Sequence, residues 1–320
     1  MSNPPSISLT PTSEGKIVTG DAFKVLDNIR DESIQLVITS PPYNIGKEYE
    51  RDERMSLNEY VAWLDQIIGK LCSKIDAKGS ICWQVGNYIK DGELFPLDYY
   101  FYNIFLKNGF KLRNRIIWHF NFGLHATKRL SGRYETLLWF TKSDEYRFNI
   151  DPIRVPQKYP GKRHPKRKGD KAGLPSGNPL GKNPSDFWEF SAQSIFEEDT
   201  IWEIPNVKSN HSEKTIHPCQ FPCELAERCV LAFTEENGTV LDPFVGTGTS
   251  VIAAVKNNRK GLGIDKNSQY ARIAKLRLTK LHNGTLQVRK LGQPVRTPKL
   301  GEKVSSLPKE WDNSLASSAR

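Results

Sequence analysis

The fold is decided by the stretch Asp242-Pro243-Phe244-Val245-Gly246-Thr247-Gly248, which closes a short apolar run with a glycine-rich turn. Far upstream, the apolar run Ile34 to Ile38 leads in the same way to Ser40-Pro41-Pro42-Tyr43. Each stretch has the form of a buried strand with polar or glycine-rich residues at its C-terminal end. Ligands of an open α/β sheet bind just beyond such strand ends. The two stretches therefore predict one site built from distant parts of the chain.

The composition is that of a soluble globular protein with one large α/β domain or two smaller ones. The chain has 320 residues, of which 38% are hydrophobic and 26% charged. No apolar run approaches the roughly 20 residues that a membrane span needs, so no membrane partner is expected. The N-terminus lacks a basic region followed by a hydrophobic block, which argues against a secretory signal. Five cysteines, an odd number, favour reduced thiols and a cytoplasmic setting.

Strands and helices alternate along most of the chain, which predicts a mostly parallel sheet with helices on both faces. A capping box, Ser56-Leu57-Asn58-Glu59, begins a long amphipathic helix that is expected to end at Gly79. A later helix over Leu225 to Phe233 is expected to end at Gly238. The seven predicted strands are Lys16–Thr19, Ile34–Thr39, Ile81–Val85, Leu112–Trp118, Thr136–Phe140, Thr239–Leu241 and Gly261–Ile264.

A basic stretch interrupts this pattern between Arg154 and Lys182, where Asp170 is the only acid. Prolines and glycines punctuate it, so we expect an extended loop without regular structure. The net charge of +10 favours a polyanionic partner, and this loop is where the charge gathers. A solvated linker is the alternative. The predicted DNA-binding residues are Lys162, Arg163, Lys166, Arg167 and Lys168.

The glycine-rich turn does not fit a dinucleotide or a triphosphate. The third glycine of G-x-G-x-x-G is replaced by Val251, and no phosphate-binding lysine follows the turn. Farther along, Asp265 ends the next strand, where a carboxylate can accept hydrogen bonds from both hydroxyls of a ribose. The alternative role for Asp265 is the N-cap of the helix that follows.

The two motifs, in this order, resemble the S-adenosylmethionine-dependent amino-group DNA methyltransferases of the circularly permuted beta class, whose catalytic motif precedes the cofactor motif. The resemblance covers about Lys16 to Leu281. It implies a Rossmann-like, seven-stranded methyltransferase sheet, S-adenosylmethionine as cofactor and double-stranded DNA as substrate. The implied segments are a flexible N-terminus (1–15), a catalytic half (16–150), an irregular target recognition insert (151–210), a cofactor-binding half (211–283) and a flexible tail (284–320).

The resemblance also implies which residues hold the cofactor. The stretch Lys214 to Pro222 is expected to line its methionine end, and Asp21 to reach its adenine ring, although Gly-Asp after a strand is also common turn chemistry. His217, Cys219 and Cys223 could instead be metal ligands, but no C-x-x-C pair accompanies them, so no metal is predicted. The implied cofactor-binding residues are Asp21, Lys214, His217, Gln220, Asp242, Phe244, Gly246, Thr247, Gly248, Thr249 and Asp265.

The implied catalytic residues are Ser40, Pro41, Pro42 and Tyr43. An exocyclic amino group is a poor nucleophile because its lone pair is delocalised into the ring. Ser40 Oγ and the Pro41 carbonyl can accept hydrogen bonds from its two N–H bonds, and the prolines hold this turn rigid. Tyr43 offers a ring face for a base that must leave the duplex to be reached. Taken alone, the tetrapeptide would be an ordinary proline turn.

Within this family, serine at the first position usually accompanies methylation of cytosine N4, and aspartate that of adenine N6. Ser40 therefore favours cytosine, whereas Asn44 is familiar from adenine enzymes. An inactive nucleic-acid-binding protein and an RNA substrate are further alternatives. Glu135 is expected to orient the base pocket or to pair with Arg133 or Arg115. By analogy, we expect a monomer or homodimer in the bacterial cytoplasm, associated with the nucleoid, with a cognate restriction endonuclease as partner.

Overall fold

The computed structural model describes residues 9–44, 55–120, 125–157, 159, 161–165, 170–188, 207, 213–217, 220–289 and 291. The predicted flexible ends lie mostly outside these residues, and Lys166, Arg167, Lys168 and Cys219 lie wholly outside them. No helix in the part of the chain described is long and apolar enough to cross a membrane.

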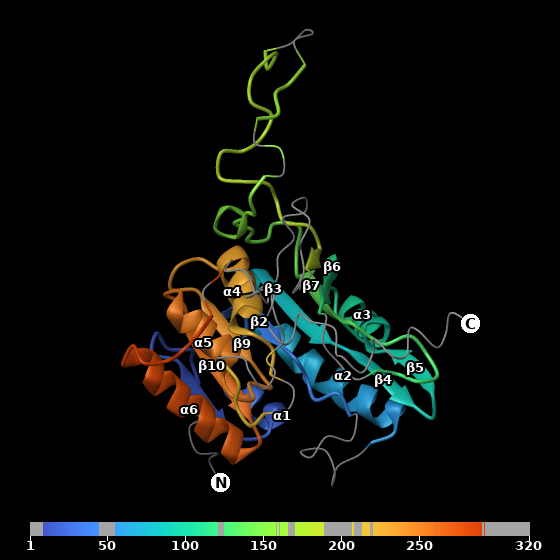
Figure 1. The fold of residues 1–320 in the computed structure, drawn as a ribbon. Helices are drawn as coiled ribbons and strands as arrows, with labels where there is room; N and C mark the ends of the chain where they lie inside the picture. Colours follow the sequence, from blue (N-terminus) through green and yellow to red (C-terminus); the bar gives the residue numbers. More distant parts are fainter. Residues whose placement is uncertain are drawn as a thin grey trace, which may run out of the picture.

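One large sheet organises the fold (Figure 1). All seven predicted strands are present in it, together with a further strand of two residues, β8. The strands are parallel apart from β7, which runs antiparallel to both β3 and β6. In sheet order they are β1 (Lys16–Thr19), β10 (Lys260–Asp265), β9 (Thr239–Asp242), β2 (Ile34–Thr39), β3 (Ile75–Val85), β7 (Tyr134–Thr141), β6 (Lys111–His119) and β8 (Phe187–Trp188).

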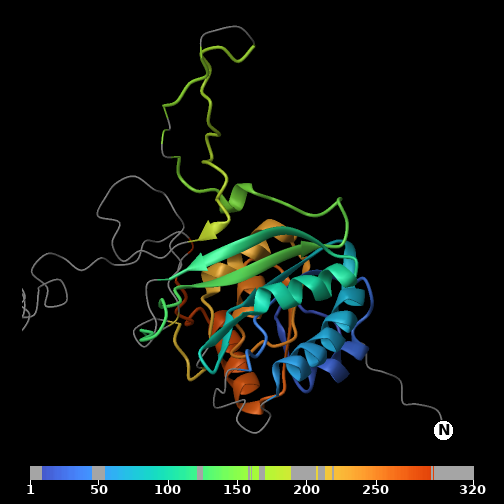
Figure 2. The same cartoon turned by 90° about the vertical axis from the view of Figure 1, so that its right-hand side faces the viewer.

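Helices cover both faces of the sheet, as predicted (Figures 1 and 2). On one face pack α4 (Cys223–Phe233), α5 (Thr249–Lys256) and α6 (Ser268–His282); on the other pack α1 (Ala22–Val25), α2 (Leu57–Lys74) and α3 (Leu97–Lys107). Strand β2 shows why two layers form: Leu36 and Ile38 belong to the first core and Val37 to the second. Successive side chains of a strand point to opposite faces, so a fully apolar strand requires cover on both.

Two predicted helix ends were wrong. The capping box does begin α2, with Ser56 Oγ accepting from Glu59 N, but the helix ends at Lys74 and β3 starts at once. Gly79 lies instead where β3 bulges out of register, and a Cβ there would sit 2.6 Å from Ile75 Cγ2. Similarly, α4 ends at Phe233 because Thr234 is already extended. Neither glycine ends its helix: Gly79 packs closely against Ile75 within β3, and Gly238 packs against the Gln35 side chain just before β9.

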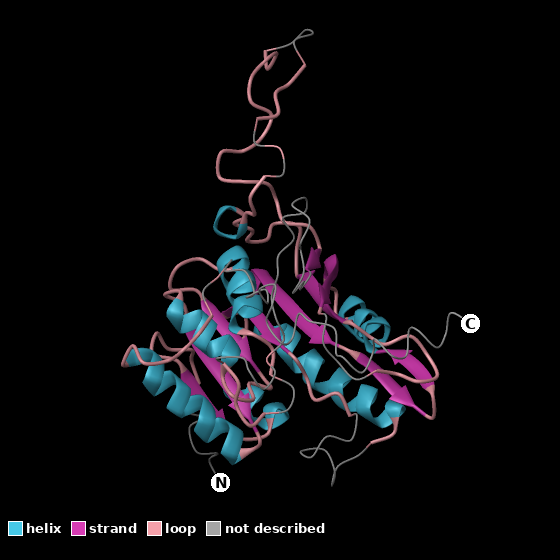
Figure 3. Ribbon diagram, in the orientation of Figure 1, coloured by secondary structure: helices cyan, strands magenta, loops and turns pink. Residues whose placement is uncertain are grey.

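The basic insert leaves the sheet as an extended arm, which Figure 3 draws without helix or strand beyond its base. Two isolated antiparallel bridges, Val155 with Lys182 and Arg163 with Pro175, hold its two sides together. Strand β8 then joins the arm to the sheet by pairing with β6. The arm therefore projects from a fixed point on the fold, and its target recognition role stays a prediction.

A small hairpin outside the large sheet was not predicted. Strands β4 (Asn87–Lys90) and β5 (Glu93–Pro96) pair antiparallel between β3 and α3. Asp91 and Gly92 form their turn, both at positive φ (52° and 85°). Asp-Gly is a strong signal for such two-residue turns, so the sequence did carry this information.

Candidate active site

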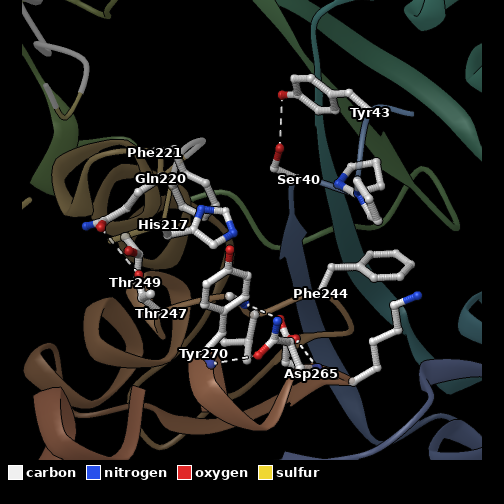
Figure 4. A pocket seen from close by; sticks show the side chains of 16 residues that line it. Ser40, Tyr43, His217, Gln220, Phe221, Phe244, Thr247, Thr249, Asp265 and Tyr270 are labelled. Carbon is white, nitrogen blue, oxygen red and sulfur yellow. Dashed lines mark hydrogen bonds between the residues drawn. The ribbon is translucent and has the colours of Figure 1, made fainter. Parts of the chain in front are cut away.

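A pocket of about 740 Å³, open space included, lies beyond the C-terminal ends of β2, β9 and β10 (Figure 4). Strands β2 and β9 pair in parallel, Leu36 with Val240, so the two motifs that follow them meet at the same edge. The stretch around His217 closes the pocket from the other side. The lining residues are Ser40, Pro41, Pro42, Tyr43, His217, Gln220, Phe221, Phe244, Val245, Gly246, Thr247, Thr249, Asp265, Lys266, Asn267 and Tyr270.

The structure thus brings the four predicted catalytic residues together with seven of the predicted cofactor residues. Four others, Asp21, Lys214, Asp242 and Gly248, do not line the pocket. Asp21 caps α1 by accepting from Phe23 N at 2.8 Å, and Lys214 Nζ donates to the His217 carbonyl at 2.9 Å. Gly248, at φ 90°, lets α5 begin against Ala274, where a Cβ would come within 2.9 Å. A cofactor role for these residues stays a prediction.

The glycine-rich turn is shaped by Asp265. One carboxylate oxygen accepts from Gly246 N and the other from Asn267 N, both at 2.8 Å. Gly246 has a φ of 51° and lies so close to His217 that a Cβ would sit 3.3 Å from the imidazole Nε2. The N-cap of α6 is Asn267, which accepts from Gln269 N and Tyr270 N. Asp265 is therefore not the cap, and its carboxylate faces the pocket.

Burial changes the protonation of two pocket groups. Desolvation raises the pKa of Asp265 above its usual value, against the two backbone hydrogen bonds that favour the charged form. Desolvation, with a smaller contribution from the charge of Lys214, lowers the pKa of His217 to about 4. Its imidazole is therefore neutral near pH 7, and its ring packs edge-on against Tyr270 at 4.6 Å between centroids. His217 therefore adds no positive charge to the pocket wall beside the glycine-rich turn.

Asp242, at the end of β9, connects the strand ends next to the pocket through hydrogen bonds. Its side chain is 1% exposed and accepts from Thr39 Oγ1 and Ser250 Oγ, each at 2.5 Å, and from Phe244 N at 3.0 Å. It thereby ties together the end of β2, the glycine-rich turn and the start of α5. Burial raises its pKa to about 6, and the hydrogen bonds from Ser250 and Thr39 oppose that rise only in part.

This raised pKa predicts an inverse pH dependence of stability. The folded state binds the Asp242 proton more tightly than the unfolded state, so the protonated carboxyl stabilises the fold and ionisation opposes folding. This stabilisation is lost as pH rises from about 4 through about 6. Relative to the isosteric Asp242→Asn, the wild type should lose roughly 1 to 2 kcal/mol of unfolding free energy between pH 5 and 7.5. Urea denaturation at both pH values measures this, with the exposed Asp170→Asn as control. A difference that does not change with pH would contradict it.

The predicted catalytic tetrapeptide is held from both sides. Tyr60 Oη, from α2, donates to the Pro42 carbonyl at 2.6 Å. The Asn44 side chain exchanges two hydrogen bonds with the Met55 backbone, at 2.7 and 3.1 Å. Asn44 itself has a φ of 55°, a conformation that asparagine tolerates better than most residues. Asn44 thus has a structural reason to be at this position and does not by itself favour adenine as the target base.

Glu135 lies at the back of the tetrapeptide. It accepts from Tyr43 Oη at 3.3 Å and from Gln84 Nε2. The alternative pairing with Arg115 was wrong, because Arg115 Nη2 lies 2.5 Å from Asp98 Oδ2. Two neighbouring aromatics pack on the fold: the His119 ring stacks on Phe187 at 5.9 Å, and Phe120 packs on Trp118.

Of the predicted DNA-binding residues, Lys162 and Arg163 are described, and they lie on the arm and not in the pocket. Lys162 and Arg163 are exposed, and Arg163 Nη1 donates to the Gly173 carbonyl at 2.9 Å. Among the described ranges, no group of three His, Cys, Asp or Glu side chains could hold a metal ion. Sequence reasoning missed Val245, Lys266, Asn267 and Tyr270 as lining residues. Lys266 and Asn267 directly follow Asp265, and Tyr270 lies in the first turn of the helix that Asn267 caps, so their position at the end of a ligand-binding strand was the available signal.

The chain resembles DNA methylases along most of its length. The N6_N4_Mtase family model, described as DNA methylase, matches residues 34–276. Type II methyltransferase M.BglII of Bacillus subtilis is 48% identical over 260 residues, which are 81% of this chain and 67% of the relative. DNA adenine methyltransferase YhdJ of Escherichia coli (strain K12) is 30% identical over 266 residues, 82% of each chain.

Solved structures agree with this fold. PvuII DNA methyltransferase (cytosine-N4-specific) superposes with a TM-score of 0.61 at 20% identity, covering 94% of this chain and 100% of that one. A putative DNA modification methylase of Thermus thermophilus, complexed with S-adenosyl-L-methionine, superposes with a TM-score of 0.55 at 26% identity, covering 86% and 100%. The predicted resemblance and the predicted methyltransferase sheet are confirmed.

Proposed function

The chain belongs to the DNA methylase family, and we propose that it transfers a methyl group from S-adenosylmethionine to the N4 amino group of cytosine in double-stranded DNA. The observation that carries this proposal is that Ser40-Pro41-Pro42-Tyr43 and the glycine-rich turn line one and the same pocket. Two reactants held in one pocket react as if intramolecularly, which is worth several orders of magnitude in rate. The expected setting is a type II restriction–modification system, where methylation protects DNA from a cognate endonuclease.

The residues of the pocket fit the cofactor. At Gly246 the turn passes close to His217, and a side chain there would crowd the imidazole and narrow the pocket that both residues line. Each carboxylate oxygen of Asp265 accepts one hydrogen bond from a backbone N–H. Each oxygen has further lone pairs that can accept hydrogen bonds from ribose hydroxyls. The neutral imidazole of His217 does not repel a positively charged sulfonium. When bound, S-adenosylmethionine supplies an electrophilic methyl group in this pocket.

On the opposite wall, Ser40 and Pro41 act on the target amine. Both place an oxygen that can accept from N–H, which withdraws the amine's hydrogens from the base plane and frees its lone pair. Tyr60 holds the neighbouring Pro42 carbonyl and Asn44 ties the chain after Tyr43 to Met55, so the backbone that carries these acceptors is fixed beforehand and little reorganisation is needed at the moment of reaction. Tyr43 lines the same pocket and offers its ring to the extruded base.

Cationic side chains support duplex DNA as the partner. Lys128 and Arg129 are exposed on the loop between β6 and β7, and this loop leads directly to Glu135 behind the tetrapeptide. Lys162 and Arg163 add charge on the arm. Neutralising phosphates with such residues supplies much of the affinity for DNA and makes it fall with salt.

The choice of cytosine rests on Ser40, since serine at this position usually accompanies N4 methylation in the family. Adenine N6 is the second candidate, because an adenine methyltransferase is among the relatives. Methylating plasmid DNA with purified protein and digesting it to nucleosides should yield N4-methylcytosine. N6-methyladenine would keep the enzyme and overturn the base. The absence of any modified base, with cofactor bound, would instead point to RNA or to a missing partner.

A further inference from the structure

A chain of four polar side chains runs from the sheet to the catalytic tetrapeptide. Ser40 Oγ lies 2.9 Å from Tyr43 Oη, and Tyr43 Oη lies 3.3 Å from Glu135 Oε2. The amide of Gln84 donates to the same carboxylate oxygen. Figure 4 shows the Ser40–Tyr43 bond at the edge of the pocket. Two residues that follow β2 thus meet one residue from β3 and one from β7 in a single hydrogen-bonded series.

The sheet holds this series in place. Strands β3 and β7 pair antiparallel, Gln84 with Leu137 and Val85 with Thr136, which sets Glu135 beside the end of β3. The next residue, Gly86, makes room for the contact: a Cβ there would lie 3.3 Å from Tyr43 Cε2 and 3.5 Å from Glu135 Cγ. The tyrosine ring and the carboxylate therefore approach each other across a glycine backbone.

The chemistry of these groups fixes the direction of each hydrogen bond. An ionised carboxylate only accepts, so the Tyr43 hydroxyl donates its single proton to Glu135. The Tyr43 oxygen can then only accept from Ser40, which donates its own proton to it. With its proton directed at Tyr43, Ser40 Oγ has lone pairs left over as acceptors. This is the state that an N–H of the target amine requires.

We propose that Glu135 is a positioning residue, which acts through Tyr43 to keep the Ser40 hydroxyl in the role of an acceptor. The proposal rests on the proposed methyl transfer to an exocyclic amine and holds for cytosine and adenine alike. Without this constraint the hydroxyl could rotate and donate to the amine nitrogen. That hydrogen bond would occupy the lone pair that must attack the methyl group. A carboxylate in place of serine could not donate in this way and would need no such control.

Tyr43→Phe tests the proposal, because it keeps the ring that stacks and removes the hydroxyl that relays. We expect kcat to fall roughly 10- to 100-fold, the effect of losing one hydrogen bond to a charged group, with the KM values for cofactor and DNA unchanged. Glu135→Gln, which can donate as well as accept, should lower kcat to a similar extent. The double variant should be no slower than the slower single variant, since both changes break one series.

Tyr134→Phe, one residue before Glu135 and 40% exposed, is the matched control and should leave kcat unchanged. Thermal unfolding and cofactor affinity show that each variant is folded. A Tyr43→Phe rate equal to wild type, or rate losses that multiply in the double variant, would overturn the relay and leave the proposed function standing. A wild-type protein that transfers no methyl group to any DNA would refute the proposed function and the relay with it.

Discussion

Replacing Ser40 by alanine is expected to lower the single-turnover rate of methyl transfer about 100- to 1000-fold, the usual cost of removing one preorganised group from a reacting centre. In the proposed reaction Ser40 Oγ accepts a hydrogen bond from the amine, and alanine has no side-chain oxygen to do so. The Pro41 carbonyl would remain, so the rate should fall and not vanish. Cofactor affinity should not change, because the groups around the glycine-rich turn are untouched.

Rapid-quench measurement with labelled cofactor and a methylatable duplex gives this rate. Ser73→Ala, an exposed serine on α2, serves as the control and should react like wild type. If Ser40→Ala reacted at the wild-type rate, Ser40 would not be the residue that activates the amine. Together with Tyr43→Phe, the measurement separates loss of the acceptor from loss of its orientation.

Replacing Asp265 by alanine should weaken binding of S-adenosylmethionine about 100-fold or more. The substitution removes the predicted ribose contact and also leaves the partly buried N–H groups of Gly246 and Asn267 without their acceptor. Each unsatisfied buried donor costs about 1–3 kcal/mol, and the turn is expected to lose its shape. Asp265→Asn keeps one acceptor and should have an intermediate affinity.

Titration calorimetry of the purified variants measures these affinities. Asp186→Ala, an exposed aspartate at the base of the arm, is the control and should bind the cofactor like wild type. An unchanged affinity for Asp265→Ala would place the cofactor elsewhere in the fold. Loss of binding with normal thermal stability would support the assignment most strongly.

The sequence predicted those parts of the fold that are coded locally. Apolar runs ending in polar or glycine-rich residues gave all seven predicted strands of the sheet and the edge where the pocket lies. Helix ends were predicted less accurately because strand pairing decides them. Helix α2 ends at Lys74 since Ile75 pairs with Ile34 and begins β3, although the next glycine, Gly79, comes four residues later. The Asp91-Gly92 hairpin was a local signal that went unused.

The partners of the site's acids lay beyond the reach of a single sequence. Asp242 belongs to the cofactor motif, yet its burial depends on Thr39 and Ser250, which only the folded sheet brings to it. Glu135 had two arginines as candidate partners in the sequence. Arg115 pairs with Asp98 instead, the register of β3 and β7 brings Gln84 and Tyr43 to the Glu135 carboxylate, and the pairing with Arg133 stays a prediction. Distances in the sequence carried no information about either choice.

The central claim is that the two motifs form one DNA-methylating site, and long-read sequencing with detection of modified bases tests it most directly. The DNA would come from a methylation-free host that expresses either the wild type or Ser40→Ala. We expect one short sequence motif to carry N4-methylcytosine with the wild type and to be largely unmodified with the variant. Unmodified DNA from cells containing folded, cofactor-binding wild-type protein would contradict the claim.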